Sequence, residues 1–464
     1  MQLPGVDDVD HAADLQELGR LVHTLGYDVV ATVSQRRHSL SPAAVLGEGK
    51  LHELGALTGG TGVVPAFTRE KKSKARERSE AEAGFADADD EPLEGDDDFD
   101  GEGDEGDERD AYDGAPSPRG SRLATVVVVD HEITPSQARN LEKATGAEVL
   151  DRTGVIVEIF HRHARSREAK LQVEIARLTY VAPRMRETGG GDRQRGGIGG
   201  KGAGESALEL DRRKIRDRIA ELREELAHVV NEQQTRAKHR RDALRVALVG
   251  YTNAGKSSLM RALTGSDVLV ADKLFATLDT TVRALHPETR PRLLVSDTVG
   301  FIKKLPHDLV ASFRSTLDEA LEASLLLYVV DASDPTHEAQ LQVTREVLAE
   351  IGADEVPSRL VLNKCDRLDD VARASLRARY PSAIQLSARI PADIVRLRAE
   401  IIAFFEASMD EEELVVPYAK QALVSEIHSH ARVLSEEYDE AGAHVRFRAQ
   451  PATIARLRSL IERS

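Results

Sequence analysis

The sequence predicts an α/β fold built around a doubly wound, mostly parallel sheet. An N-terminal α/β domain and a helical hairpin are expected before it, and a small α+β domain after it. The chain has 464 residues, enough for roughly two to four domains. Between residue 245 and about residue 409, short apolar strands alternate with amphipathic helices, which is typical of a doubly wound sheet. A similar alternation over residues 14–160 favours the second α/β domain.

The N-terminal domain is expected to span residues 1–165. Strand and helix patterns continue on both sides of an interruption at about 60–122, so the interruption is predicted to be an insertion within one domain. The predicted elements are a helix from about 14 to Gly26, a β-branched strand at 27–33, a short helix that follows 45–50 and ends at about 57, a strand at 124–129, a helix at 135–145 and strands at 148–150 and 156–160.

The insertion is strongly acidic. Residues 77–113 contain 19 Asp and Glu residues and two arginines, a net charge of −17 against −16 for the whole chain. The rest of the chain is therefore close to neutral, and the overall acidity does not exclude a polyanionic partner. A segment of this composition buries too little apolar surface to fold, so disorder is expected. Either it competes with RNA for basic residues of the chain, or it is a solubilising insertion without a role.

Two helices are predicted at 167–183 and 206–239, on either side of a glycine-rich stretch at 189–204. Apolar residues of the second helix recur at alternating steps of four and three, which is the spacing of a coiled-coil seam. The simplest arrangement is an antiparallel hairpin of the two helices, covering 166–243. The alternative is a core helix of the neighbouring domain. The seam residues are Ile215, Ile219, Leu222, Leu226 and Val229.

The rest of the chain is predicted to form the domain with the doubly wound sheet, over 244–410, and the small α+β domain, over 411–464. The sheet strands are predicted at 246–249, 293–296, 325–330 and 360–362. The last domain is predicted to contain a strand near 414–416, a helix from about 419 to 434, a strand at 443–449 and a final helix.

Composition limits the setting of the protein. Cys365 is the only cysteine, which excludes an internal disulfide and a Cys-based zinc site and fits a reducing compartment. No apolar run approaches the roughly 18–20 residues of a membrane span. The first residues lack the basic and apolar regions of a secretory signal. A soluble, cytoplasmic protein is expected.

Residues Gly250–Ser257 match the phosphate-loop pattern G-x-x-x-x-G-K-[ST], directly after a predicted strand and before a predicted helix. Glycines allow the backbone to wrap phosphates, so that N–H groups at a helix N-terminus point at them. Lys256 would place a positive charge on the β- and γ-phosphates, and the Ser257 hydroxyl could bind Mg²⁺. The motif alone predicts only a nucleoside triphosphate.

Further motifs at the ends of the next strands predict guanine. Asp297-Thr-Val-Gly300 would place a carboxylate near the metal and a flexible glycine under the γ-phosphate. In Asn363-Lys-Cys-Asp366, Asp366 could accept hydrogen bonds from N1 and N2 of guanine, which adenine cannot donate. In Ser387-Ala-Arg389, the N–H of Ala388 could meet the guanine O6. Together with the phosphate loop, these are four motifs in this order, each after a strand, and they predict a guanine-specific site.

A switch loop is expected between the phosphate loop and Asp297, at Phe275-Ala-Thr-Leu-Asp279 and the threonines after it. One threonine must reach Mg²⁺ and the γ-phosphate, and spacing alone leaves Thr277, Thr280 and Thr281 as candidates. After Gly300, many GTPases have a glutamine that orients the attacking water. Phe301 cannot do so. Either another group supplies this function and intrinsic hydrolysis is slow, or Phe301 is a core residue and hydrolysis uses another route.

These motifs resemble the HflX-type GTPases of the translation-factor-related class. The resemblance extends to Asp151-Arg-Thr153, Leu171-Gln-Val-Glu174, Gly204-Glu205 with Glu209 and Asp211-Arg-Arg213, Gln35-Arg-Arg37 and Gly47-Glu-Gly-Lys50. It covers nearly the whole chain apart from about 60–122. Ala203 and Ser206 depart from the family's usual proline and threonine in the glycine-rich linker, and the acidic insertion is not a family feature.

The resemblance implies a GTPase that binds the large ribosomal subunit and its rRNA, hydrolyses GTP slowly alone and faster on the ribosome, and splits stalled or idle ribosomes under stress. It selects Thr277 as the switch threonine and, with Ser257, as the Mg²⁺ ligand, while Lys256, Thr277 and Gly300 would act in catalysis. The residues expected to contact GTP, GDP or Mg²⁺ are Gly250, Tyr251, Thr252, Asn253, Ala254, Gly255, Lys256, Ser257, Ser258, Phe275, Ala276, Thr277, Leu278, Asp279, Asp297, Thr298, Val299, Gly300, Asn363, Lys364, Cys365, Asp366, Ser387, Ala388 and Arg389.

Basic residues indicate where RNA would bind. Residues 162–195 contain nine Lys and Arg against four acids, and Tyr180 is the only aromatic residue nearby, so we expect recognition of phosphates and shape. For any single residue, a solvated basic surface explains the charge equally well. No DNA partner is expected, and the protein is expected to be a monomer. The rival hypothesis is a slow GTP-dependent binding switch for a protein complex or a membrane-bound protease, with peripheral association at the membrane.

Overall fold

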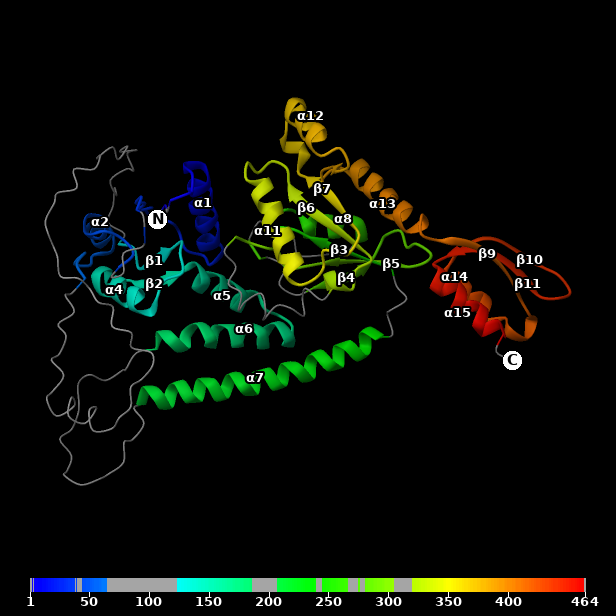
Figure 1. Cartoon of the computed structure of the whole chain (residues 1–464), viewed down its shortest axis with the longest axis horizontal. Helices are drawn as coiled ribbons and strands as arrows, with labels where there is room; N and C mark the ends of the chain where they lie inside the picture. The colour runs from blue at the N-terminus through cyan, green and yellow to red at the C-terminus, as the bar shows by residue number, and fades with distance from the viewer. Residues whose placement is uncertain are drawn as a thin grey trace, which may run out of the picture. The chain divides into compact units, whose positions relative to one another are not determined.

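The computed structural model describes residues 2, 4–37, 39, 44–64, 123–185, 207–238, 244–265, 274–275, 280–303 and 319–462, apart from the side chains of 207–209 and 233–238. Figure 1 labels their helices and strands. The chain divides into two compact units. One comprises Met1, Val30–Val127 and Ser136–Val149, and the other Gln2–Val29, Val128–Pro135 and Leu150–Ser464. The acidic tract and the glycine-rich stretch lie outside the described residues, and the boundaries of the four predicted domains stay predictions.

The smaller unit contains α2 (Glu48–Thr58), nearly all of α4 (Pro135–Thr145) and the first halves of β1 (Val126–Val129) and β2 (Glu148–Asp151), which form a two-stranded sheet. All four were predicted. A Cβ on Gly60 would lie 2.4 Å from the carbonyl oxygens of Ala144 and Thr145, and Gly62 N donates to Ala144 O at 2.8 Å. Residues at the start of the predicted insertion are therefore packed against the end of α4.

Three N-terminal helices belong to the larger unit: α1 (Asp8–Thr24), α5 (Arg152–His163) and α6 (Arg167–Val181). Helix α5 corrects a prediction, because 156–160 was expected to be a strand. The Asp151 side chain accepts a hydrogen bond from Gly154 N at 2.8 Å and so caps the helix. The run Val155–Phe160 is apolar enough to fit either periodicity, and the cap starts a helix.

The strand predicted at 27–33 is also wrong, because these residues form no strand in the structure. Val29 and Val30 are 54% and 58% exposed. β-Branched residues favour strands where a pleated surface buries them, and that burial is missing here.

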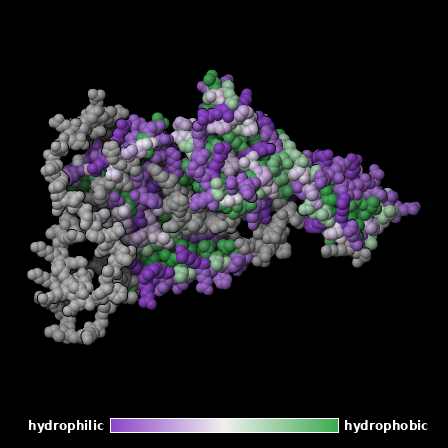
Figure 2. Space-filling view, viewed as in Figure 1, coloured by the Kyte–Doolittle hydropathy of each residue, from purple (hydrophilic) through white to green (hydrophobic). Residues whose placement is uncertain are grey.

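The predicted hairpin is confirmed. After the short 3₁₀ helix Ala182–Arg184 and the glycine-rich stretch, α7 (Ala207–Lys238) packs antiparallel to α6. Leu171 and Ile175 of α6 meet Leu222 of α7, with Ile219, Leu226 and Val229 alongside. In Figure 2, hydrophilic residues predominate along the visible face of α7, and hydrophobic residues show at its junction with α6.

The predicted doubly wound sheet is also confirmed. Its order is β4-β5-β3-β6-β7-β8, and only β4 runs antiparallel to its neighbour. Its strands are β3 (Leu244–Val249), β4 (Thr281–Ala284), β5 (Leu293–Asp297), β6 (Leu325–Asp331), β7 (Ser358–Asn363) and β8 (Ile384–Gln385), and its helices are α8 (Lys256–Thr264), α11 (His337–Glu350), the 3₁₀ helix Cys365–Arg367, α12 (Asp370–Arg379) and α13 (Pro391–Glu406).

The last residues form a three-stranded antiparallel sheet in the order β10-β11-β9, with two helices packed on its buried side chains. The predicted helix 419–434 is too long. It ends at His430, because Ala431 takes an extended conformation, and β10 follows. The elements are β9 (Asp410–Val416), the 3₁₀ helix Tyr418–Lys420, α14 (Ala422–His430), β10 (Arg432–Tyr438), β11 (Ala443–Ala449) and α15 (Pro451–Glu462).

Candidate functional site

The phosphate loop joins β3 to α8 at the carboxyl edge of the sheet. Two of its glycines are required by their surroundings. A Cβ on Gly250 would lie 2.2 Å from the Val329 carbonyl oxygen, and one on Gly255 would lie 2.2 Å from Nδ2 of Asn363. Both residues also have positive φ angles, +151° and +97°, which are costly for other residues. The backbone of the loop is therefore free to approach a ligand closely.

Lys256 is buried under this loop and is 6% exposed. Its Nζ donates to the carbonyl oxygens of Gly250 at 3.0 Å and Tyr251 at 2.9 Å. Burial lowers the pKa of this ammonium group to about 8, and the negative charge of Asp297 partly opposes that shift. An ammonium group has three N–H donors. These two bonds hold the side chain in place and leave a third donor for a phosphate oxygen.

Oxygen ligands suited to Mg²⁺ meet where α8 begins and β5 ends. Ser257 Oγ donates to Asp297 Oδ2 at 2.6 Å, and Asp297 is fully buried. Hydroxyl and carboxylate oxygens are the ligands that Mg²⁺ prefers. The residues present therefore fit this cation.

A buried hydroxyl in the loop also fits a bound phosphate. Thr252 is 6% exposed, and its Oγ1 has no hydrogen-bond partner among the described residues. A buried polar group without a partner is costly, and a phosphate oxygen is an acceptor that could satisfy this one. Ala276, Thr277, Leu278 and Asp279 lie outside the described residues.

The segment after β5 lies against the phosphate loop. A Cβ on Gly300 would lie 2.8 Å from Thr252 Cα and 3.1 Å from Lys256 Nζ. Thr252 N donates to Phe301 O at 2.8 Å, and Phe301 N donates to Gly250 O at 3.2 Å. Gly300 is thus held beside the lysine that would bind the same γ-phosphate.

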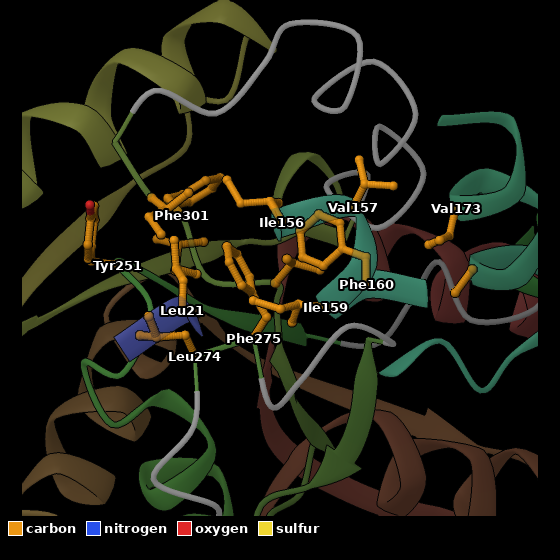
Figure 3. Packing of buried hydrophobic residues seen from close by; sticks show 14 of the residues in the cluster. Leu21, Ile156, Val157, Ile159, Phe160, Val173, Tyr251, Leu274, Phe275 and Phe301 are labelled. Atoms are coloured by element: carbon orange, nitrogen blue, oxygen red, sulfur yellow. The ribbon is translucent and has the colours of Figure 1, made fainter. Parts of the chain in front are cut away.

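Phe301 is a core residue, as one of the two hypotheses had it. Its side chain is 2% exposed and packs in a hydrophobic cluster with α1 and α5 (Figure 3). Phe275, from the predicted switch loop, lies in the same cluster, and its ring meets the Phe160 ring edge-to-face with centroids 4.6 Å apart. A buried phenyl ring cannot orient water, so Phe301 takes no such role.

The residues predicted to bind guanine are brought together and tied to the phosphate loop. Asn363 Nδ2 donates to Ala254 O at 2.9 Å, and Asn363 Oδ1 accepts from Ala388 N at 3.1 Å. The Ala388 N–H that was expected to meet guanine O6 is thus engaged by Asn363. Lys364 Nζ donates to Asn253 O at 2.7 Å. The two ends of the site therefore form one connected unit.

Asp366 is exposed, as a carboxylate that meets a base must be. A hydrogen bond from the Ser387 side chain holds the pKa of Asp366 below its usual value. The carboxylate is therefore ionised at neutral pH and able to accept two N–H donors. The neighbouring Cys365 is buried, and its Sγ donates to Leu362 O at 3.2 Å.

Three site residues were not found from the sequence. Asp331 ends β6, and its Oδ2 accepts from Lys364 Nζ at 2.7 Å. A charged residue at the carboxyl end of an apolar strand is a signal that could have found it. Glu17 and Asp14 of α1 contact Tyr251 and Lys303, and no local pattern indicates this.

The comparisons with known proteins agree with this geometry. A family model described as "GTP-binding GTPase N-terminal" matches residues 12–66 and 119–161, one described as "GTP-binding GTPase Middle Region" matches 163–240, and one described as "50S ribosome-binding GTPase" matches 245–364. A GTPase HflX from Gluconacetobacter diazotrophicus is 64% identical over 465 residues, covering 100% of this chain and 97% of that protein.

The chain belongs to the HflX family of GTPases. The Escherichia coli GTPase HflX is 41% identical over 325 residues, which cover 69% of this chain and 76% of that protein. A GTP-binding protein from Sulfolobus solfataricus, solved with GDP, is 22% identical with a TM-score of 0.40, covering 83% of this chain and 96% of that one. The curated HflX relatives and the matching GTPase family models show that the chain is an HflX-type enzyme that hydrolyses GTP. In its described part, no helix is both long and apolar enough to cross a membrane.

Proposed function

We propose that GTP binds with Mg²⁺ across the carboxyl edge of the sheet and is hydrolysed there, and that this cycle is coupled to the large ribosomal subunit. Asp366 would accept hydrogen bonds from N1–H and N2–H of guanine, while Lys256 would donate a hydrogen bond from its third N–H to the phosphates. Ser257, together with Thr277, would hold the cation. The position of Gly300 beside Lys256 supports this assignment most directly.

The chain's own residues act by positioning. Backbone N–H groups of the phosphate loop and the Lys256 ammonium would stabilise charge that develops on the transferring phosphoryl group. The N–H of Gly300 would add one donor from the opposite side. Mg²⁺, when bound, would neutralise charge between the β- and γ-phosphates. Because Phe301 is buried, the group that orients the water is another one, and this favours slow hydrolysis in the isolated protein.

Two substitutions test the nucleotide assignment. Lys256→Ala should abolish tight GTP binding, because it removes the buried charge under the loop, and an undiminished affinity would contradict the site. Asp366→Asn should shift the preference from GTP toward xanthosine triphosphate, whose base presents an acceptor where guanine presents a donor. Affinities measured with both nucleotides decide this, and an unchanged preference would remove Asp366 from base selection.

The proposed ribosome contact is the exposed basic stripe of α6. Arg167, Lys170 and Arg177 recur at helical spacing on one face and are exposed. Arg184 is different, because it donates to Asp151 Oδ2 at 2.6 Å and lies 3.8 Å above the Tyr180 ring. Tyr180 itself donates to Asp151. These two residues serve the fold, so the stripe on α6 is the better candidate for meeting rRNA phosphates.

The experiment is GTP turnover with and without purified large ribosomal subunits at two salt concentrations. We expect stimulation that fades as salt rises, and a Lys170→Gln/Arg177→Gln variant should weaken binding and reduce its salt dependence by about one counterion per lost phosphate contact. Arg377→Gln, at an exposed site on α12, is the control.

The proposed output, separation of stalled or idle ribosomes into subunits under stress, is tested by sedimentation of intact ribosomes with GTP and the protein. Accumulation of free subunits supports it. If ribosomes stay intact although hydrolysis is stimulated, the splitting proposal is contradicted and the proposed ribosome contact stands. No stimulation at either salt, with GTP binding intact, would favour a slow binding switch for a protein complex or a membrane-bound protease.

A further inference from the structure

Helix α1 lies outside the nucleotide-binding sheet, yet one of its side chains bonds to the phosphate loop. Tyr251 Oη donates to Glu17 Oε2 at 2.6 Å. The same hydroxyl accepts a hydrogen bond from the backbone N–H of Lys303 at 2.7 Å. A phenol has one donor and acceptor capacity besides, so both bonds form together. Tyr251 thus joins α1 to the segment three residues after Gly300.

The Glu17 carboxylate is itself fixed by charge. Arg152 donates to Glu17 through Nη2 and to Asp130 Oδ1 through Nη1, the latter at 2.7 Å. Arg152 is 1% exposed, so its two carboxylate bonds are shielded from water and salt. Glu17 is therefore a rigid acceptor for the Tyr251 hydroxyl.

The segment after β5, residues 300–303, is also held to α1 by a side chain. Lys303 Nζ lies 3.4 Å from Asp14 Oδ1 and 3.9 Å from Asp10 Oδ1. The backbone hydrogen bonds between Thr252 and Phe301 and between Phe301 and Gly250 complete the connection. Moving Tyr251 must therefore move the phosphate loop and residues 301–303 together.

We propose that Glu17 is a positioning residue for GTP hydrolysis, acting through Tyr251 on the segment that carries Gly300. This rests on the proposed nucleotide site. The relay holds Gly300 beside Lys256, where both would meet a γ-phosphate. GDP has no γ-phosphate, so loss of the Glu17 carboxylate should impair the hydrolytic step and leave GDP affinity nearly unchanged. A purely structural role for Glu17 would instead affect GDP and GTP alike.

The test uses the full chain, with single-turnover GTP hydrolysis and GDP affinity measured side by side. Glu17→Ala and Tyr251→Phe should each slow hydrolysis about tenfold, roughly the worth of one hydrogen bond to a charged group. For Glu17→Ala, GDP affinity should stay within about twofold, because Glu17 lies outside the residues expected to contact GDP. The double variant should be no slower than either single one, since both break the same relay.

A carboxylate on another helix provides the control. Glu158→Ala on α5 removes a carboxylate that pairs with Arg162 at the surface, and it should leave hydrolysis unchanged. Tyr251→Phe leaves no buried charge uncompensated, so it stays informative if Glu17→Ala fails to fold. Unchanged or faster hydrolysis in Tyr251→Phe, or additive losses in the double variant, overturns the relay. Absence of GDP binding by the unmodified protein overturns the nucleotide site as well.

Discussion

On one face of the central sheet, Val246 and Leu248 of β3 lie in a core with α8 and α13, two helices that follow strands of this sheet in the chain. On the other face, Ala247 and Val249 enter a core that α11 shares with α1, α5 and α6 from the N-terminal part of the chain. Phe275 and Phe301, which flank the nucleotide site, lie only in this second core (Figure 3).

The difference teaches that the two cores have different tasks. The core with α8 and α13 stabilises the sheet and contains neither Phe275 nor Phe301. The shared core also contains Phe275 and Phe301, which come from the two segments predicted to respond to the γ-phosphate. Packing there affects both the stability and the conformation of the site. Substitutions matched in chemistry but placed on opposite faces should separate these tasks.

The largest effect is expected from a pair of Phe→Ala substitutions. Phe160→Ala, in the shared core, and Phe405→Ala, in the core with α13, each remove a buried ring. Each should lower the free energy of unfolding by about 3–5 kcal/mol, measured by urea denaturation. Only Phe160→Ala should also slow GTP hydrolysis at temperatures where both variants are folded, because it removes the ring against which Phe275 rests. Equal kinetics in the two variants would erase the distinction between the faces.

The next effect concerns the approach of Gly300 to the loop. Gly300→Ala adds a Cβ 2.8 Å from Thr252 Cα and 3.1 Å from Lys256 Nζ, so the switch segment must move away. Displacement of about 1 Å can cost about 100-fold in rate, and hydrolysis should fall by that order while GDP affinity changes little. Gly49→Ala, where a Cβ meets nothing within 4 Å, is the control. A normal rate in Gly300→Ala would separate Gly300 from catalysis.

A smaller effect is expected from pH. Burial lowers the pKa of Lys256 to about 8, so the free protein loses this positive charge as pH rises through 8, and the charge is fully present well below it. GTP affinity should therefore fall about fourfold between pH 7 and 8.5, measured by titration calorimetry. Lys256→Ala has no ammonium to titrate, and its residual affinity should be flat over the same range. A GTP affinity that rises with pH would contradict a lowered pKa of Lys256.

The smallest effect is expected away from both faces. Arg167 of α6 and Glu225 of α7 form an exposed ion pair at 3.6 Å, and such pairs contribute roughly 0–1 kcal/mol. Arg167→Ala should change the free energy of unfolding by less than about 0.5 kcal/mol in denaturant titrations. A loss comparable to that of Phe160→Ala would mean that the hairpin depends on charge more than on its apolar seam.

Local patterns were enough to predict the sheet, the α6–α7 seam and the clustering of Lys256, Asp297 and Asn363. Each depends on periodicity or on the rule that the carboxyl ends of parallel strands lie at the same edge of a sheet. Helix α5 was missed because five of the six residues in Val155–Phe160 are apolar and three of these are β-branched at 155–157, which is a stronger signal for a strand than the Asp151 cap is for a helix. The bond between Glu17 and Tyr251 joins residues 234 positions apart, and no pattern along the chain encodes such a contact.

The single cysteine has a practical consequence. Cys365 is buried, and burial raises the pKa of its thiol, so it is a poor nucleophile toward labelling reagents. A cysteine introduced at an exposed position of α1, such as Val9, would therefore take up a fluorophore with little background. The unmodified chain is in this sense ready for optical experiments that follow α1 through the nucleotide cycle in real time.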